Sequence, residues 1–130
     1  MLVRQVAVHE QVVVGVFEAL VLGEHAFLEA IQKKYKDPDL DVQTLAEEMG
    51  MSRSLLNDKI QKNLGQSIAQ FIRTYRLNVA KEMIVNGTNE DMNISEIAYE
   101  VGFNDPKYFT RCFTKEFGAT PSDLHRKGKE

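Results

Sequence analysis

The sequence predicts an all-α protein in which a long linker helix joins two helix-turn-helix subdomains, with about seven helices in total. Apolar residues recur at helical spacing, and residues that favour helix ends stand where each apolar stripe begins or stops. No segment after residue 23 alternates with the period of a strand. The third observation is an internal repeat, which defines the two subdomains.

The second half of the chain repeats the first half. Residues 42–51 align with residues 94–103 at an offset of 52, and beyond the shared glycine the offset becomes 53. The later part of the alignment pairs Leu56, Ile60, Leu64, Gly65 and Ser67 with Phe109, Phe113, Phe117, Gly118 and Thr120. Each copy predicts a short helix, a glycine-containing turn and a second helix, the unit that places a helix in a DNA groove. Chance does not explain the whole register, so we expect a protein that contacts two neighbouring groove segments.

The first copy shows where each of its helices should begin or end. A helix that ends before Asp37 is predicted from the apolar stripe of His25, Leu28, Ile31 and Tyr35. Asp41 is expected to cap a short helix that ends near Gly50. Ser52 is expected to cap the following helix, which Gly65 ends.

The longest helix is expected to open at Ser67 and to run to about Val85, where Asn86-Gly87 ends it. Its predicted buried face consists of Ile68, Phe71, Ile72, Tyr75, Val79, Met83 and Ile84. About 19 residues at roughly 1.5 Å each span about 28 Å. Successive major-groove segments on one side of DNA lie about 34 Å apart, so this helix is a suitable spacer between two recognition helices.

The second copy carries the same kinds of signal after a polar loop from Thr88 to Met92. Asn93 and Glu96 predict a capping box for the first of its helices. Asp105 is expected as the N-cap of the next helix, with Pro106 as its first residue and Gly118 at its end. A short last helix is expected to start at Thr120-Pro121.

Composition excludes several classes of protein. The chain has 130 residues and 43% hydrophobic content, which suits one compact domain. Cys112 is the only cysteine, which excludes an internal disulfide and a cysteine-based zinc site and is compatible with a cytoplasmic location. No run is long enough for a membrane span, and His9, His25 and His125 lack the spacing of metal ligands. No nucleophile motif or phosphate loop is present, so we expect neither a catalytic site nor a cofactor.

The net charge of −3 is unusual for a nucleic-acid binder, but the charge is unevenly distributed. Residues 1–51 hold 4 Lys and Arg against 9 Asp and Glu, a net of −5, whereas residues 52–130 hold 12 against 10, a net of +2. Non-specific affinity for DNA comes from neutralising phosphates, so we expect it to be weak.

The expected helix from Pro106 to Phe117 separates into two arcs. The predicted apolar arc holds Tyr108, Phe109, Cys112, Phe113 and Phe117, with Glu116 as its only polar residue. The polar arc holds Lys107, Thr110, Arg111, Thr114 and Lys115. Arg111 has the donors to pair with guanine, Lys107 with guanine or phosphate, and Thr110 can contact a thymine methyl. The alternative is an ordinary solvated face, and the repeat favours the groove-binding interpretation.

The matching helix of the first copy places Leu56, Ile60 and Leu64 inside and Ser54, Asn57, Asp58 and Gln61 outside. Asn57 can pair with adenine, and Ser54 suits a short polar contact. Asp58 stands where the repeat has Arg111, so the two copies are not expected to contribute equally. Three alternatives remain for Asp58: repulsion of phosphates, an ion pair with Lys62 or plain solvation, or acceptance of a hydrogen bond from cytosine.

The run from Ile97 to Pro121 resembles the signature of the AraC/XylS family of bacterial transcription regulators. The matching residues are Ile97-Ala98, Val101-Gly102-Phe103, Asp105, Tyr108-Phe109, Arg111, Phe113, Lys115, Phe117-Gly118 and Thr120-Pro121. Gly50-Met51-Ser52 and Arg76-Leu77-x-x-Ala80 match the first half and the linker helix of the same pattern, so the resemblance covers about residues 24–127. Residues 97–109 further resemble output domains of hybrid two-component sensor-regulators.

The resemblance implies two helix-turn-helix units whose second helices enter adjacent major grooves. The implied base-contacting residues are Ser54, Asn57, Asp58, Lys107, Thr110 and Arg111, and we add Asn104 from the same motif to the expected DNA-binding set. The family usually has a basic residue where Asp58 stands. Its members normally carry a separate sensing or dimerising domain, which residues 1–23 are too short to supply.

The expected organisation is a first helix-turn-helix unit over 24–66, a linker helix over 67–86 and a second unit over 93–127, within a DNA-binding domain of 24–130. Residues 1–23 are an upstream remnant, an arm or an association surface. Arg76 either anchors the two halves through a buried ion pair or lies at the surface.

The sequence therefore predicts sequence-specific binding of double-stranded promoter DNA and regulation of transcription. The rival interpretation is a helical module that docks RNA polymerase or an upstream receiver domain with little DNA affinity, and an enzyme is a distant third. We expect a cytoplasmic domain without membrane contact, monomeric or weakly associating, whose partners are DNA, RNA polymerase and a missing sensor or receiver domain.

Overall fold

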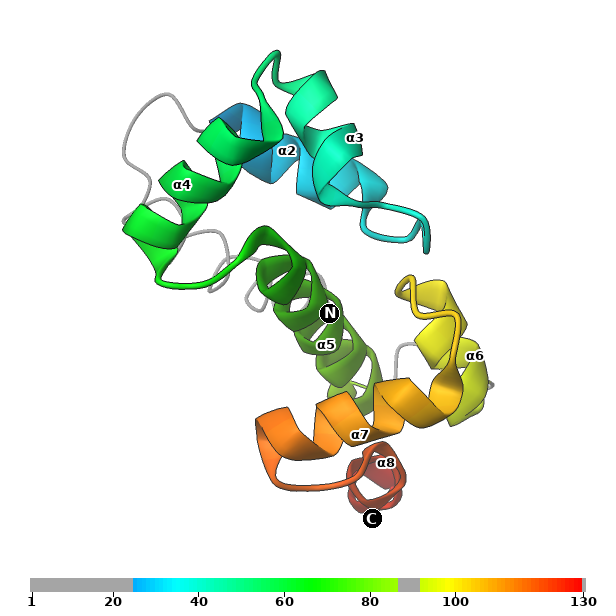
Figure 1. The fold of residues 1–130 in the computed structure, drawn as a ribbon. Coiled ribbons are helices and arrows are strands. Elements are labelled where there is room, and N and C mark those ends of the chain that lie inside the picture. Colours follow the sequence, from blue (N-terminus) through cyan, green and yellow to red (C-terminus); the bar gives the residue numbers. More distant parts are fainter. Residues whose placement is uncertain (1–24, 87–91, 130) are drawn as a thin grey trace.

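The computed structural model describes residues 25–86 and 92–129, and all regular structure in these ranges is helical (Figure 1). The helices are α2 (His25–Lys34), α3 (Val42–Glu48), α4 (Arg53–Leu64), α5 (Ile68–Asn86), α6 (Ile94–Glu100), α7 (Pro106–Phe117) and α8 (Pro121–Lys129). The all-α prediction with about seven helices is thus confirmed. The expectations for residues 1–23 and for most of the polar loop before Met92 fall outside the described residues.

The predicted N-caps are confirmed at four helices. Asp41 Oδ1 accepts from the Thr44 backbone N–H at 2.8 Å and from the Thr44 hydroxyl at 2.9 Å. Ser52 caps α4 through the Leu55 backbone N–H at 3.1 Å. Asn93 and Glu96 form the reciprocal capping box of α6, and Asp105 caps α7, where Pro106 is the first helical residue. Each cap satisfies N–H groups that have no partner within their own helix.

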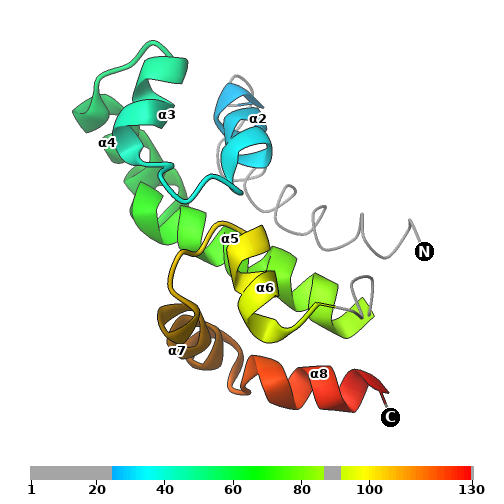
Figure 2. The ribbon, with the colours of Figure 1, turned by 90° about the vertical axis from the view of Figure 1, so that its right-hand side faces the viewer.

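Helix α5 runs through the middle of the molecule, as two views of the fold show (Figures 1 and 2). It packs against α4 of the first unit and against α6, α7 and α8 of the second unit. Its buried side chains include the predicted Ile68, Phe71, Ile72, Tyr75, Val79 and Ile84, together with Arg76, Leu77 and Ala80. Met83 is half-buried and packs against the edge of the core, so it lies on the predicted face without being fully covered. Because α5 is covered by both units, it buries more of its circumference than one amphipathic stripe predicts.

The sequence repeat is also a repeat of geometry. The Met51 backbone N–H donates to the Ala46 carbonyl at 2.9 Å, and the equivalent Phe103 N–H donates to the Ala98 carbonyl at 2.9 Å. Gly50 and Gly102 both have positive φ, +65° and +101°, which closes each turn in a conformation that favours glycine. In the second helices of the units, the paired residues Leu56 and Phe109, and Ile60 and Phe113, are all fully buried.

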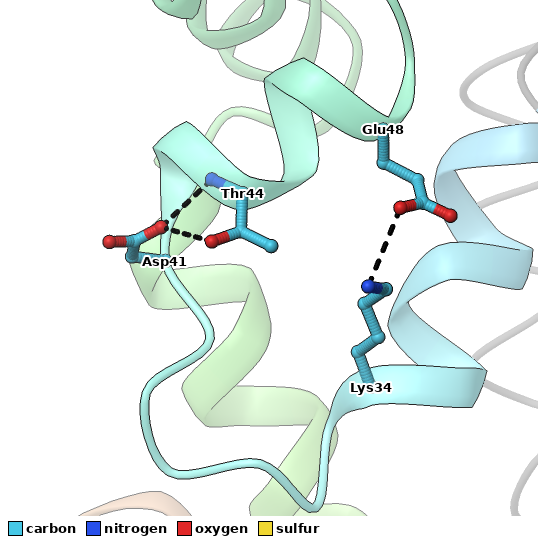
Figure 3. Close-up of polar contacts among 4 residues, drawn as sticks. All are labelled: Lys34, Asp41, Thr44 and Glu48. Carbon is cyan, nitrogen blue, oxygen red and sulfur yellow. Dashed lines mark hydrogen bonds and ion pairs between the residues drawn. The ribbon is translucent and has the colours of Figure 1, made fainter.

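Helix α3 has a polar contact at each end, and the second of these joins it to α2 (Figure 3). The Asp41 cap sets its beginning, and an ion pair of 3.4 Å joins Lys34 of α2 to Glu48 in its last turn. The two bonds from Thr44 favour the charged carboxylate and lower the pKa of Asp41.

Arg76 connects the first unit to α5 through hydrogen bonds rather than an ion pair. Its Nε donates to the Tyr35 carbonyl at 2.8 Å and its Nη2 to the Asp37 carbonyl at 2.7 Å. Both carbonyls follow the C-terminus of α2, where the helix dipole favours a cation. The side chain is only 9% exposed, and burial lowers the pKa of its guanidinium, with the Asp37 charge opposing that shift. Arg76 is therefore an anchor and not a surface residue, as one of the two expectations had it. The expected ion pair is wrong, because backbone carbonyls take the place of a carboxylate.

Gly102 of the second unit packs directly against Tyr35 and Arg76. A Cβ atom at this position would overlap the Tyr35 backbone oxygen and would lie 2.7 Å from Arg76 Nε. Nearby, the Lys36 ammonium of the first unit pairs with the Glu100 carboxylate of α6 at 3.0 Å. The glycine is therefore required by close contact as well as by its φ angle, and this contact joins the two units.

We expect Gly102→Ala to destabilise the protein more than Gly50→Ala. Gly50 has open space around its Cβ position, so its substitution carries only the left-handed strain of about 1–2 kcal/mol. Gly102→Ala adds overpacking of roughly 1–3 kcal/mol against Tyr35 and Arg76. Urea denaturation of both variants measures the difference, and equal losses would contradict the close contact between the units.

Candidate nucleic-acid interface

Helix α7 presents its polar arc outward because its apolar arc is held by the core. Phe109 and Phe113 are fully buried, with ring centroids 5.6 Å apart. Lys107, Arg111 and Lys115 are exposed on the other side, and Thr110 is half-buried. The arrangement sets three cations and a hydroxyl along one side of the helix, where they can contact guanine, thymine and phosphate.

Tyr108 and Glu116 were wrongly placed on the buried arc of α7. Tyr108 is 40% exposed and Glu116 is exposed. The Tyr108 ring packs on Phe103 at 6.1 Å, while the Arg111 guanidinium lies 5.7 Å from its centroid. At 100° per residue both positions fall at the margins of the apolar arc, where neighbouring elements decide burial. Tyr108 therefore orients Arg111 through a cation–π contact.

Helix α4 exposes the equivalent arc of the first unit. Ser54, Asp58 and Gln61 are exposed and Asn57 is half-buried, while Ser52 and Gly65 set the ends of the helix. Asp58 forms no ion pair with Lys62 or with any other residue in the part of the chain that the structure describes. Leu55, at the position equivalent to Tyr108, is 48% exposed and was missed by the sequence analysis.

The polar groups on these arcs are available to a partner. Within residues 25–86 and 92–129, the side chains of Ser54, Asn57, Asp58, Asn104, Lys107 and Thr110 form no hydrogen bond, although the backbones of Lys107 and Thr110 do. Asn104 is exposed in the turn before α7. It lies with Tyr108 on the wall of a cavity beside α5. The structure brings Asn104, Lys107, Thr110 and Arg111 together in α7 and the turn before it, beside the first half of α5, and places Ser54, Asn57 and Asp58 on α4.

Arg73 of α5 joins the cations of α7, although the sequence analysis did not select it. A groove of about 560 Å³ between α5 and α7 is lined by Arg73, Arg111 and Lys115, together with Gln70. Glu116 is the acidic residue on this wall. Periodicity places Arg73 off the apolar face of α5, but only the packing of α5 on α7 shows that it faces the same groove as Arg111.

Helix α7 lies against the first half of α5, through Gln70, Arg73, Thr74 and Leu77. In Figure 2, α4 and α7 lie toward the same side of the molecule, on either flank of the beginning of α5. The 19 residues of α5 match the expected spacer. At roughly 1.5 Å per residue this helix is about 28 Å long. Because α7 packs on its first half, this length is not itself the separation of α4 and α7. The arrangement suits two recognition helices on one side of a DNA duplex.

Residues 45–127 match the family described as a helix-turn-helix domain, over more than half of the chain. The chain belongs to the AraC-type helix-turn-helix family. This domain family is one of DNA-binding transcription regulators, so the resemblance in the sequence is confirmed. The interpretation as a protein-interaction module with little DNA affinity is not favoured.

Relatives of this AraC-type domain include parts of much longer proteins. Histidine kinase P4 of Formosa agariphila is 36% identical over 100 residues, which are 77% of this chain and 7% of the kinase. Transcriptional activator RhrA of Rhizobium meliloti is 44% identical over 62 residues, which are 48% of this chain and 19% of the activator. The chain thus spans only a small part of these relatives.

A solved structure matches nearly the whole described fold. The C-terminal domain of the two-component response regulator yesN from Fusobacterium nucleatum superposes with a TM-score of 0.73 at 27% identity. The match covers 81% of this chain and 99% of that domain.

The described residues hold neither a metal site nor a membrane span. No three His, Cys, Asp or Glu side chains gather there as metal ligands. None of the helices in the described ranges has the length and apolar character needed to cross a bilayer.

We expect Asp58→Arg to strengthen binding to DNA by about 1–3 kcal/mol, because it replaces a repelled carboxylate by a cation that pairs with phosphate or guanine. The salt dependence of binding should also become steeper. Anisotropy titrations on a selected site and on random DNA measure both effects.

Asn63→Arg is the matched control for that substitution. It adds a cation to the same helix about 140° away from Asp58, outside the polar arc. Unchanged affinity and salt slope for Asp58→Arg would contradict the placement of α4 in the groove. A weakened selected site with a changed base preference would instead assign Asp58 to a cytosine.

Proposed function

We propose that this AraC-type domain regulates transcription by inserting α4 and α7 into adjacent major grooves of promoter DNA. The observation that carries this proposal is the pair of unengaged polar arcs on α4 and α7, two helices that lie toward the same side of the molecule. Sequence discrimination then comes from side chains on the two arcs, and α5 sets the spacing between them.

The second unit supplies most of the affinity in this proposal. Arg111 pairs with guanine, held in place by the Tyr108 ring, and Lys107 contacts guanine or phosphate. Arg73 and Lys115, on either side of the α5–α7 groove, neutralise phosphates beside that contact. In the first unit Asn57 pairs with adenine and Ser54 makes a short polar contact, while Asp58 holds the affinity down.

The domain acts as the output part of a longer protein. Its relatives include a histidine kinase of which the matched region is 7%. We therefore assign residues 24–130 to the DNA-binding domain, with units at 24–66 and 93–127 and the linker helix at 67–86, downstream of a sensor or receiver domain. Promoter DNA and RNA polymerase are its partners in the cytoplasm, where bacterial promoters are transcribed.

The decisive experiment is a fluorescence anisotropy titration against DNA selected from a random pool, at two salt concentrations. Binding that weakens steeply with salt and prefers the selected sequence supports the proposal, because counterion release accompanies phosphate contacts. Absence of binding at both salt concentrations contradicts it and restores the adaptor interpretation.

Lys107→Ala and Arg111→Ala should each weaken binding to the selected site by about 1–3 kcal/mol. Both side chains are exposed and leave the core unchanged, so the unfolding midpoint should stay the same. Lys33→Ala removes an exposed cation from α2 and serves as the control. Wild-type affinity of a folded double variant would show that α7 does not enter the groove.

The chain should sediment as a monomer or as a weak associate at micromolar concentration. Two recognition helices already lie in one chain, so no second copy is needed to contact two groove segments. Analytical ultracentrifugation measures this, and a tight dimer would point to residues 1–23 as an interface.

A further inference from the structure

A cavity of about 260 Å³ lies where the two units meet α5. Its walls come from the α2–α3 region, from α5 and from the turn that leads into α7. The apolar part of the wall includes Leu40, Val42, Ile72, Phe103 and Tyr108. The volume lies just under the range of about 300–1,000 Å³ typical of ligand clefts, so a small molecule fits it best.

One wall of this cavity contains a buried cation without an ionic partner. Arg76 is only 9% exposed, and two of its five N–H donors are used on the Tyr35 and Asp37 carbonyls. Its Nη1 has no acceptor among the described residues, and no carboxylate lies within ion-pair distance of the guanidinium there. Asp37 acts on this guanidinium only from beyond ion-pair distance, so a bound anion would supply the close pair that a buried charge favours.

The other charged groups on the wall leave the cavity cationic. Arg73 is half-buried and adds a second guanidinium. Asp41 is the one acidic residue on the wall, and its Oδ1 accepts both bonds from Thr44 at the start of α3 (Figure 3). Two arginines against one engaged carboxylate favour an anionic ligand.

We infer that this cavity binds a small monocarboxylate with an apolar ring. The carboxylate pairs with Arg76 Nη1, a charge-assisted hydrogen bond that the protein itself leaves unmade. The ring lies against the apolar wall that Phe103 and Tyr108 contribute. The guanidinium therefore selects the charge of the ligand, and the two aromatic residues select its shape.

The position of the cavity couples this ligand to DNA. Arg73 and Tyr108 also line the α5–α7 groove, which the proposed function assigns to DNA phosphates. A carboxylate that draws Arg73 toward the cavity removes a phosphate contact, so the ligand and DNA weaken each other's binding by the same factor. This coupling rests on the proposed function, whereas binding of the carboxylate does not.

Isothermal titration calorimetry of the full chain with phenylacetate tests the inference. We expect saturable binding with a Kd of about 1 mM or tighter. Phenylacetamide, which is neutral and almost the same shape, and inorganic phosphate, which has no ring, should each bind at least about tenfold more weakly. Equal binding of the amide, tighter binding of phosphate, or no saturable binding of phenylacetate would overturn the inference.

Two variants locate the ligand without disturbing the Arg76 anchor. Ala69→Trp fills the cavity from an exposed position on α5 and should abolish phenylacetate binding with an unchanged thermal midpoint. Gln32→Trp places the same side chain on exposed α2 and should bind phenylacetate like the wild type. Retained binding in Ala69→Trp would overturn the assignment to this cavity.

Anisotropy with saturating phenylacetate then tests the coupling. We expect DNA affinity to fall about five-fold or more, the lower end of ordinary coupling between sites. Carboxylate binding with unchanged DNA affinity would overturn the coupling through Arg73. If the chain fails to bind any DNA, calorimetry still decides the ligand site, so the two proposals fail separately.

Discussion

The contact of the Arg76 guanidinium with the first unit is the interaction on which the placement of the two units depends most directly. Arg76 reaches from α5 to two backbone carbonyls that follow α2, and Gly102 of the second unit packs directly over this contact. A side chain at Gly102 or a shorter residue at position 76 would separate α5 from both neighbours at once. This contact contains neither polar arc, yet together with the packing of α5 on α4 and α7 it holds the two arcs in place.

The elements of this fold were predictable because their signals are local. Caps at Asp41, Ser52, Asn93 and Asp105 act within three residues, and the periodicity of each helix shows which side is buried. The repeat added long-range information, since equal spacing in two segments implies equal geometry. The matching turns at Gly50 and Gly102 bear this out in their hydrogen bonds.

The errors lie where two elements meet. Tyr108 sits at the margin of its apolar arc, and its exposure depends on how far Phe103 covers it. Arg73 has no distinguishing mark in the sequence, because its role follows from the packing of α7 on α5. The partners of Arg76 lie 41 and 39 residues away in the chain, and backbone carbonyls carry no residue-specific signal. The candidate DNA-contacting residues came from the repeat and the family pattern, and no local signal ranks them by energy.

The two units have the same fold but different polar surfaces, so the molecule has a defined orientation on DNA in the proposed binding mode. A symmetric dimer binds a palindromic site, which is the same in both orientations. Here one chain holds an arc with Arg111 and Lys107 on one recognition helix and an arc with Asp58 on the other. In the proposed binding mode, the two halves of its site are therefore different sequences in a fixed order. Inverting such a site turns the whole protein around on the promoter. Whatever is attached to the chain then faces upstream instead of downstream, and the polarity of the site becomes part of the instruction that the DNA carries.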